Sequence, residues 1–180
     1  MEAIQIRFIT PFSQSKNIGF EYNQCISELP DNCFVVLRDQ DTLPLCSDWG
    51  NQIHAVIQAN PDYQIIGCMT NRLRAPYQLA GGQFSNDPDI SNHIEIANQL
   101  WDDKGTLVTE VPLVAGMCMI FHKSVWEQIR FNENTIFFDK QFCEQARKLK
   151  MKIGVARGVY LFHLYRWGKA DPFTYKGHLL

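Results

Sequence analysis

The chain has 180 residues, a formal net charge of −2 at pH 7 and 46% hydrophobic residues. This length is typical of one domain with a buried core, and the charge gives no reason to expect nucleic acid or an anionic membrane as a partner. No apolar run approaches the length of a membrane helix. Residues 1–7 lack the basic and apolar blocks of a signal peptide, so we expect a cytoplasmic protein without a transmembrane segment.

Apolar periodicity predicts alternating strands and helices in the first half of the chain. Prolines mark several boundaries, since Pro11 ends a predicted strand and Pro30 ends a predicted helix. In chain order we expect a strand over 4–10, a helix over 18–29, a strand over 34–37, a turn at Pro44, a helix over 49–59 capped by Asp48, and a strand over 64–69.

The second half continues this alternation after an irregular stretch over 73–88. We expect a helix over 91–101, an extended segment over 106–111, a strand over 117–122, a helix over 124–129, a helix that begins at Asp139, and strands over 152–156 and 159–162. The aromatic, basic tail over 165–180 is predicted to be a loop or lid. The pattern indicates a single α/β domain over 1–180, with a mixed, mainly parallel sheet flanked by helices.

Two carboxylates, Asp39 and Asp41, stand where the buried strand 34–37 should end. A carboxylate pair at the C-terminal edge of a sheet can hold a hard divalent cation, and ligands of open α/β sheets bind at that edge. A second Asp-x-Asp, Asp87-Pro88-Asp89, follows no apolar run and lies in a turn-rich stretch. The position after a strand therefore makes the first pair a candidate metal site, although ordinary loop acids remain the alternative.

His163 and Asp139 are the next candidates. His163 directly follows the last predicted strand, where a neutral imidazole would complete a mixed nitrogen and oxygen site for manganese or a similar ion; the alternative is a packed, hydrogen-bonded histidine. Asp139 begins a predicted helix, so its carboxylate could cap that helix or act as a general base.

A strand end running into a helix start, from Thr10-Pro11-Phe12 to Lys16-Asn17, offers backbone amides and a lysine that favour phosphate. Such connections are common, so this segment alone is weak evidence. The six cysteines contain no Cys-x-x-Cys pair and four lie in apolar or helical runs, which favours reduced, mostly buried thiols over a disulfide framework or a zinc site.

Taken in order, these segments resemble glycosyltransferases of the GT-A fold and the family 2 type. In the N-terminal half the similar features are Thr10-Pro11, Asn17-x-Gly19, and the strand 34–37 with Asp39-Gln40-Asp41. In the C-terminal half, 114–120 resembles the glycine-containing strand that lines the sugar site, 139–147 resembles the Asp-x-Asp-Phe-Ser-x-Arg-Ala helix start, and 158–163 resembles the closing strand and its histidine.

The resemblance implies a metal-dependent enzyme that transfers a sugar from a UDP- or GDP-linked donor to a hydroxyl group of a glycan or another acceptor. It implies one inverting displacement, with Asp139 as the base that deprotonates the acceptor. Asp41 and His163 would be ligands of Mn²⁺ or Mg²⁺, and Asp39 would lie towards the metal, the ribose or a metal-bound water. The residues it places around the donor are Thr10, Pro11, Phe12, Asn17, Arg38, Asp39, Asp41 and Gly116.

Three features depart from the family pattern. Residues 11–38 leave no room for the strand–helix unit that usually precedes the acidic pair and supplies an acid that reads the nucleotide base. Gln141 and Gln145 replace a frequent acid and a frequent arginine. Arg38 directly precedes Asp39, where it could pair with a carboxylate or contact the diphosphate. These departures leave open a non-catalytic sugar- or nucleotide-binding module that retains the fold.

Two other enzyme classes agree less well with the residues. A sugar nucleotidyltransferase would be expected to carry a glycine-rich, basic loop after the first strand, and residues 10–15 contain no glycine. A metal-dependent hydrolase would be expected to bring more acids and histidines to one site.

Overall fold

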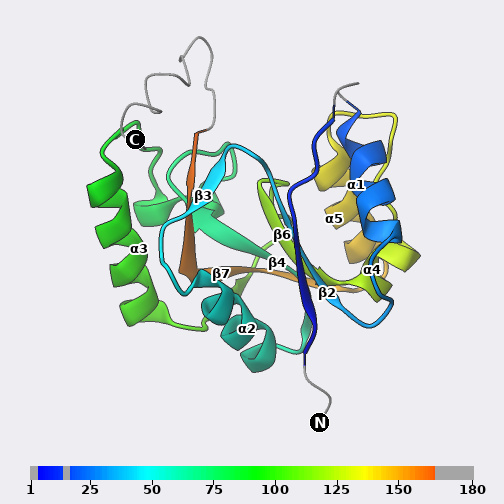
Figure 1. Ribbon diagram of the computed structural model, residues 1–180, viewed down its shortest axis with the longest axis horizontal. Helices are drawn as coiled ribbons and strands as arrows, with labels where there is room; N and C mark the ends of the chain where they lie inside the picture. Colours follow the sequence, from blue (N-terminus) through cyan, green and yellow to red (C-terminus); the bar gives the residue numbers. More distant parts are fainter. Residues whose placement is uncertain (1–3, 14–16, 165–180) are drawn as a thin grey trace.

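The computed structural model describes residues 4–13 and 17–164, an α/β structure with one seven-stranded mixed sheet between helices (Figure 1). The strands are β1 (Ile6–Ile9), β2 (Phe34–Arg38), β3 (Thr42–Pro44), β4 (Tyr63–Thr70), β5 (Val108–Glu110), β6 (Cys118–His122) and β7 (Lys152–His163). The helices are α1 (Ile18–Ser27), α2 (Trp49–Ala59), α3 (Ile90–Lys104), α4 (Lys123–Gln128) and α5 (Phe138–Lys148), with short 3₁₀ turns over Pro76–Gln78 and Ala80–Gly82. The lid predicted over 165–180 lies outside the described residues.

The strand order is β1-β2-β6-β4-β7-β3, and β5 also pairs with β7. The β1–β2 and β4–β7 pairs are parallel, whereas β2–β6, β4–β6, β3–β7 and β5–β7 are antiparallel. The sheet is therefore mixed as predicted, but the expectation that it is mainly parallel is wrong. The reason is that β6 runs backwards between β2 and β4, and two short strands turn back along β7.

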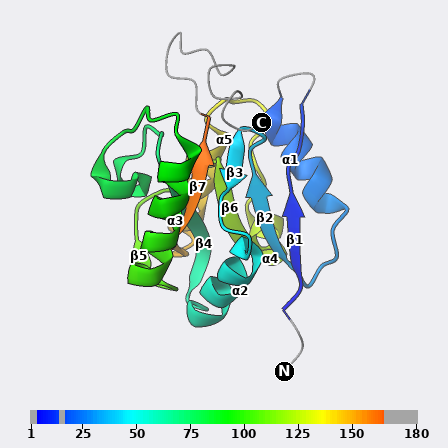
Figure 2. The same ribbon diagram turned by 60° about the vertical axis from the view of Figure 1, so that its left-hand side comes forward.

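Helices cover both faces of this sheet. Helices α1, α4 and α5 pack on one face and α2 on the other, while α3 packs along β7 (Figures 1 and 2). Strand β2 shows why its sequence is continuously apolar: Val35 and Leu37 are buried in one core, and Val36 is buried in the other. Because both faces of β2 are buried, its polar residues come only at the end of the strand, from Arg38 onwards.

Strand β7 is one element where the sequence predicts two. Its pairing with β4 shifts register, because Cys68 is opposite Ala156 but the next residue, Met69, is opposite Tyr160. The intervening residues 157–159 form a bulge, which redirects a strand. At its centre Gly158 passes so close to the end of α3 that a Cβ there would lie 2.1 Å from the Gly105 carbonyl oxygen. A glycine is therefore needed at this position.

Strand β3 replaces the predicted turn at Pro44. Three residues are too few for a recognisable pattern, and the segment is extended because it pairs with the end of β7. Thr42 lies opposite His163 in this pairing. The strand therefore joins the acidic segment to the C-terminal end of the sheet.

A buried asparagine fixes α1 against the C-terminal half of the chain. Asn23 donates from Nδ2 to the carbonyl of Phe131 (2.8 Å) and to Glu133 (2.9 Å). Its Oδ1 accepts from the indole N–H of Trp126 (2.9 Å) and the backbone N–H of Phe131 (3.1 Å). The Asn23 side chain thus uses both its N–H donors and its oxygen. These hydrogen bonds hold α1 in place, and with it Tyr22, the residue before Asn23.

All six cysteines lie within the described residues and are free thiols, as predicted. Cys33, Cys68, Cys118 and Cys143 are buried, and the other two are half-buried. None of the helices in the described part of the chain combines the length and the apolar character that crossing a membrane requires.

Candidate functional site

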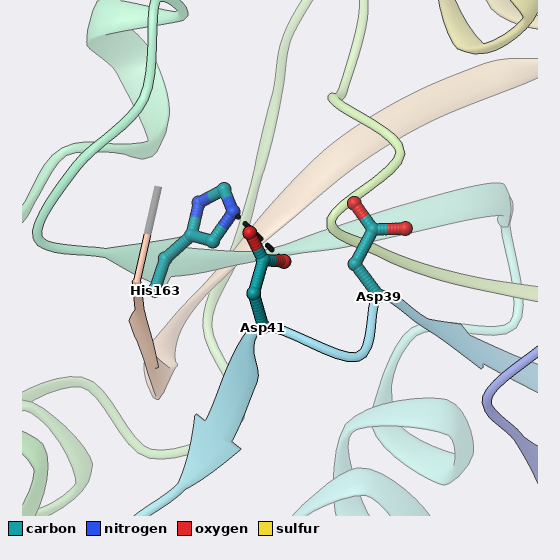
Figure 3. A group of neighbouring side chains, drawn as sticks. All are labelled: Asp39, Asp41 and His163. Atoms are coloured by element: carbon teal, nitrogen blue, oxygen red, sulfur yellow. Dashed lines mark ion pairs between the residues drawn. The ribbon is translucent and has the colours of Figure 1, made fainter. Parts of the chain in front are cut away.

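Asp39, Asp41 and His163 meet at one edge of the sheet (Figure 3). Each offers a ligand atom, and these atoms lie within 4.8 Å of one another. Asp39 follows β2, Asp41 precedes β3 and His163 ends β7. The pairing of β3 with β7 brings the segments together, and the backbone N–H of Leu164 donates to the Asp41 carbonyl (2.8 Å). The predicted convergence of these three residues is confirmed.

The imidazole of His163 is held in one orientation. Its Nδ1 lies 2.9 Å from the carbonyl oxygen of Arg72, which can only accept, so Nδ1 carries a proton. Nε2 then faces Asp41 Oδ1 at 3.4 Å (Figure 3). The His163 side chain is 4% exposed and that of Asp41 is 45% exposed, so the pair opens towards Asp41. The lone pair of Nε2 and the carboxylate of Asp41 repel each other unless a second imidazole proton or a cation lies between them.

Asp39 is held by backbone and side-chain contacts. Its N–H donates to the carbonyl of Met117 (3.0 Å), and its own carbonyl accepts from the hydroxyl of Thr42 (2.8 Å). One carboxylate oxygen, Oδ1, accepts a 2.5 Å hydrogen bond from the hydroxyl of Tyr22. Tyr22 is buried on α1, so this helix orients the Asp39 carboxylate.

The electrostatics of this edge disfavour another negative charge. Burial raises the pKa of Asp39 to about 6, and the charges of Asp41 and Asp139 act in the same direction. The Tyr22 hydrogen bond and His163 act in the opposite direction. Burial, followed by the charge of Asp39, also raises the pKa of Tyr22. A cation among these groups would relieve the repulsion between the carboxylates.

A cavity of about 350 Å³ opens beside the two acids. Its other lining residues are Pro11, Phe12, Ser13, Ile18, Glu21, Tyr22 and Gln40. Pro11 and Phe12, both predicted to lie near the donor, are thus part of its wall, and Phe12 is 62% exposed.

Three other residues predicted around the donor make structural contacts. Arg38 donates from Nη1 to the Thr42 carbonyl and from Nη2 to the hydroxyl of Thr10 (3.3 Å), so it clamps the turn that carries the acids. Asn17 caps α1, since its Oδ1 accepts from the backbone N–H of Phe20 (3.1 Å). Lys16 lies outside the described residues.

Asp139 is not a helix cap, because α5 begins at Phe138 and its N-cap residue is Phe137. The capping interpretation is therefore wrong. Asp139 lies in the first turn, where its Oδ2 accepts from the backbone N–H of Gly116 (2.9 Å) and its Oδ1 from that of Lys140 (2.7 Å). Gly116 has close neighbours, since a Cβ there would lie 3.0 Å from the Phe138 ring.

Consecutive residues thus position both acids of the predicted mechanism: Gly116 binds Asp139, and Met117 binds Asp39. A second cavity, of about 540 Å³, lies against Asp139. Its other lining residues are Leu73, Arg74, Ala75, Tyr77, Leu113, Ala115, Ile136, Phe137 and Lys140.

The supports of the acidic cluster were not predicted as site residues. Tyr22 lies within the helix predicted over 18–29, and its hydroxyl has no sequence signature. Asn71, whose Oδ1 accepts from the backbone N–H of His163 (2.8 Å), and Arg72 follow the predicted strand 64–69. Polar residues at a strand end are the signal that identified Asp39, so the same rule applied to β4 would have found these two.

The second Asp-x-Asp behaves as its turn-rich context predicts. Asp89 caps α3 by accepting from the backbone N–H of Ser91 (2.9 Å), and Asp87 accepts from the side chain of Asn92 (2.8 Å). Both acids therefore organise the start of one helix. Of the two pairs, the one after β2 reaches the cluster with His163.

Neither a model of a known protein family nor a curated protein matches this chain. The functional assignment therefore depends on the residues and on their geometry.

Proposed function

We propose that this protein is a glycosyltransferase with a GT-A-type fold, which uses a divalent cation to transfer a sugar from a UDP- or GDP-linked donor to a hydroxyl acceptor. The observation that supports this proposal is the meeting of Asp39, Asp41 and His163 beside a cavity. Carboxylate oxygens suit Mg²⁺ and Mn²⁺, and the imidazole nitrogen makes Mn²⁺ the better match.

The donor set fits such an ion on local grounds. The bond from His163 Nδ1 to the Arg72 carbonyl leaves Nε2 as the ligating nitrogen. Metal-bound histidines commonly donate their other ring N–H to a carbonyl or carboxylate in this way. Asp41 is the partner of Nε2. Burial, and after it the charge of Asp41, raises the pKa of Asp39, and both effects favour a cation at the same place.

Each residue has a role in this proposal. A bound divalent cation would neutralise the charge that develops on the diphosphate leaving group. Asp41 and His163 would hold that cation, with Asp39 towards it or the ribose, and Pro11 and Phe12 would form a wall beside the donor. Asp139 accepts the proton of the acceptor hydroxyl in a single inverting displacement. Because the transition state resembles an oxocarbenium ion, positioning and charge stabilisation supply most of the rate.

The first prediction concerns Asp41. UDP or GDP should raise the melting temperature of the parent protein only when Mn²⁺ is present, because a ligand that binds the folded state stabilises it. Asp41→Ala should abolish this shift while changing the stability of the ligand-free protein by at most roughly 0.5 kcal/mol. Thermal-shift measurements check both, with Asp103→Ala, an exposed aspartate on α3, as the control that keeps the shift. An unchanged shift in Asp41→Ala would show that the metal assignment is wrong.

The second prediction concerns Asp139. Asp139→Asn retains an oxygen that can accept the hydrogen bond from the backbone N–H of Gly116. The asparagine amide cannot act as a base that removes a proton from the acceptor. We expect normal folding, normal nucleotide binding and a loss of transfer of about a hundred- to ten-thousandfold. A structural Asp139 predicts the reverse, with transfer retained in Asp139→Asn and stability lost in Asp139→Ala. Melting temperature and donor turnover, measured on both variants, decide between them.

Turnover also tests the alternative, a binding module without activity. Metal-dependent hydrolysis of a UDP- or GDP-sugar by the parent protein supports a transferase. Nucleotide binding without any turnover of donor supports the binding module.

A further inference from the structure

The cavity against Asp139 has a mostly apolar wall. It measures about 540 Å³, within the usual range for small-molecule pockets, against about 350 Å³ for the cavity beside Asp39. Its apolar lining side chains are Leu73, Ala75, Tyr77, Leu113, Ala115, Ile136 and Phe137. The charged lining residues are Arg74, Asp139 and Lys140, and Lys140 already pairs with Glu144 at 3.7 Å.

Two residues of this wall expose an unusual amount of apolar surface. Ile136 is 80% exposed and Phe137 is 59% exposed, although both are large apolar side chains. They are consecutive and directly precede α5, so they form one apolar edge of the cavity. Exposed apolar surface that borders a cavity is typical of a place where a ligand covers it.

Asp139 links this cavity to the acidic cluster. Asp139 is one of the residues that line the cavity, and its charge acts on both Asp39 and Tyr22. It is fixed by the amide of Gly116, whose neighbour Met117 accepts from the amide of Asp39. A hydroxyl group of a ligand in this cavity can therefore donate to Asp139, the acidic residue of its wall.

We propose that the acceptor is an alcohol with an apolar ring-sized body, such as a phenol, rather than a sugar. Each hydroxyl of a sugar needs a hydrogen-bond partner when it leaves water, and most of the side chains that line this cavity are apolar. An apolar body that covers Ile136 and Phe137 removes apolar surface from water, which favours binding, and its single hydroxyl can donate a hydrogen bond to Asp139.

The chemical step depends on the proposed function and balances without a further reagent. The acceptor oxygen forms a bond to the anomeric carbon of the donor sugar. The bond from that carbon to the diphosphate oxygen breaks, and its electron pair leaves with the nucleoside diphosphate. The hydroxyl proton passes to the carboxylate of Asp139.

Binding of 2-naphthol, a fluorescent phenol with a fused apolar ring, tests this site without donor or metal. We expect saturable binding to the parent and a loss of affinity of about tenfold in Phe137→Ser. Serine is a preferred N-cap residue, so this variant should fold normally. The control is Leu149→Ser, which removes a side chain that is 52% exposed at the other end of α5 and should leave the affinity within about twofold.

A neutral disaccharide such as maltose should not displace the phenol. The inference is overturned if the phenol does not bind, if Phe137→Ser binds it as tightly as the parent, or if maltose displaces it. Mn²⁺-dependent stabilisation by UDP or GDP is measured separately on the same protein. Its absence would contradict the proposed function alone, whereas failed phenol binding would contradict the acceptor class alone.

Discussion

The hydroxyl of Tyr22 and the carboxylate of Asp39 connect the candidate metal centre to helix α1 through a 2.5 Å hydrogen bond. Burial raises the pKa of both groups, so each is harder to ionise than in water. For Asp39 the burial effect and the charge of Asp41 exceed the opposing effects of Tyr22 and His163. A carboxyl group in this state is costly to ionise until a cation or a donor compensates it.

The third prediction follows from this pKa. Asp39 ionises at about 6 in the folded protein against an ordinary value of 3.8. Between these values the unfolded chain has released the proton while the folded protein keeps it, so the folded state binds more protons. The free energy of unfolding should therefore fall, through this group, as the pH rises from about 4 to about 6, and then level off.

Asp39→Asn isolates the contribution of this carboxyl, since its amide oxygen can still accept from Tyr22. Urea denaturation of the metal-free proteins, at several pH values from about 4 to about 7, should show the parent losing stability relative to the variant. Titrating groups that do not interact with Asp39 contribute equally in both proteins and cancel in the difference. A difference that does not change with pH would show that Asp39 ionises near its ordinary pKa.

Strand β7 is the element that assembles the site. It pairs with β4, β5 and β3, and the bulge over 157–159 separates its two halves. Only the second half reaches β3, where His163 lies opposite Thr42. The path of the strand depends on Gly158, because the backbone of Gly105 occupies the space that a side chain would need.

The fourth prediction is that Gly158→Ala destabilises the protein by roughly 1–3 kcal/mol, as overpacking against a backbone does. Because the strand must shift to relieve the clash, the Mn²⁺-dependent stabilisation by nucleotide should also weaken. Gly50→Ala is the matched control: its Cβ would meet the Phe8 ring at an ordinary 3.8 Å in the first turn of α2. That variant should be neutral or gain up to about 1 kcal/mol. Urea denaturation of both variants is the measurement, and equal effects would contradict the packing argument.

At the scale of the whole molecule, the sheet is covered on both faces and hides most of the thiols. Cys68 and Cys118 are fully buried on neighbouring strands, with their sulfur atoms 3.7 Å apart. Burial raises the pKa of Cys143 to about 12. The pKa of Cys68 is raised by its hydrogen bond with the thiol of Cys118 and by burial. Buried thiols of this kind react slowly because the thiolate is the nucleophile.

The fifth prediction counts thiols. Ellman's reagent should react promptly with at most Cys25 and Cys46 in the folded protein, because these two are half-buried, and with all six cysteines after denaturation. The double variant Cys25→Ser, Cys46→Ser should show no prompt reaction. Prompt reaction of a third thiol in the parent would mean that one face of the sheet opens in solution.

Local patterns in the sequence determined much of the molecule. The apolar run over 34–37 predicted β2 and placed Asp39 and Asp41 at its end, and helical spacing predicted α1, α2 and α5. His163 was likewise placed at a strand end. These features depend on neighbours in the chain, such as strand length, helical period and capping, so they can be seen without a structure.

Pairing and packing between distant segments were decided by the tertiary structure. The reversed β6, together with the short strands β3 and β5, made most pairings antiparallel, and β3 became a strand only because β7 lies beside it. The contacts of Tyr22 with Asp39 and of His163 with Arg72 join segments that are far apart in the chain. Side-chain periodicity states which face of an element is apolar but not which element will cover it, and the supports of this site depend on that second choice.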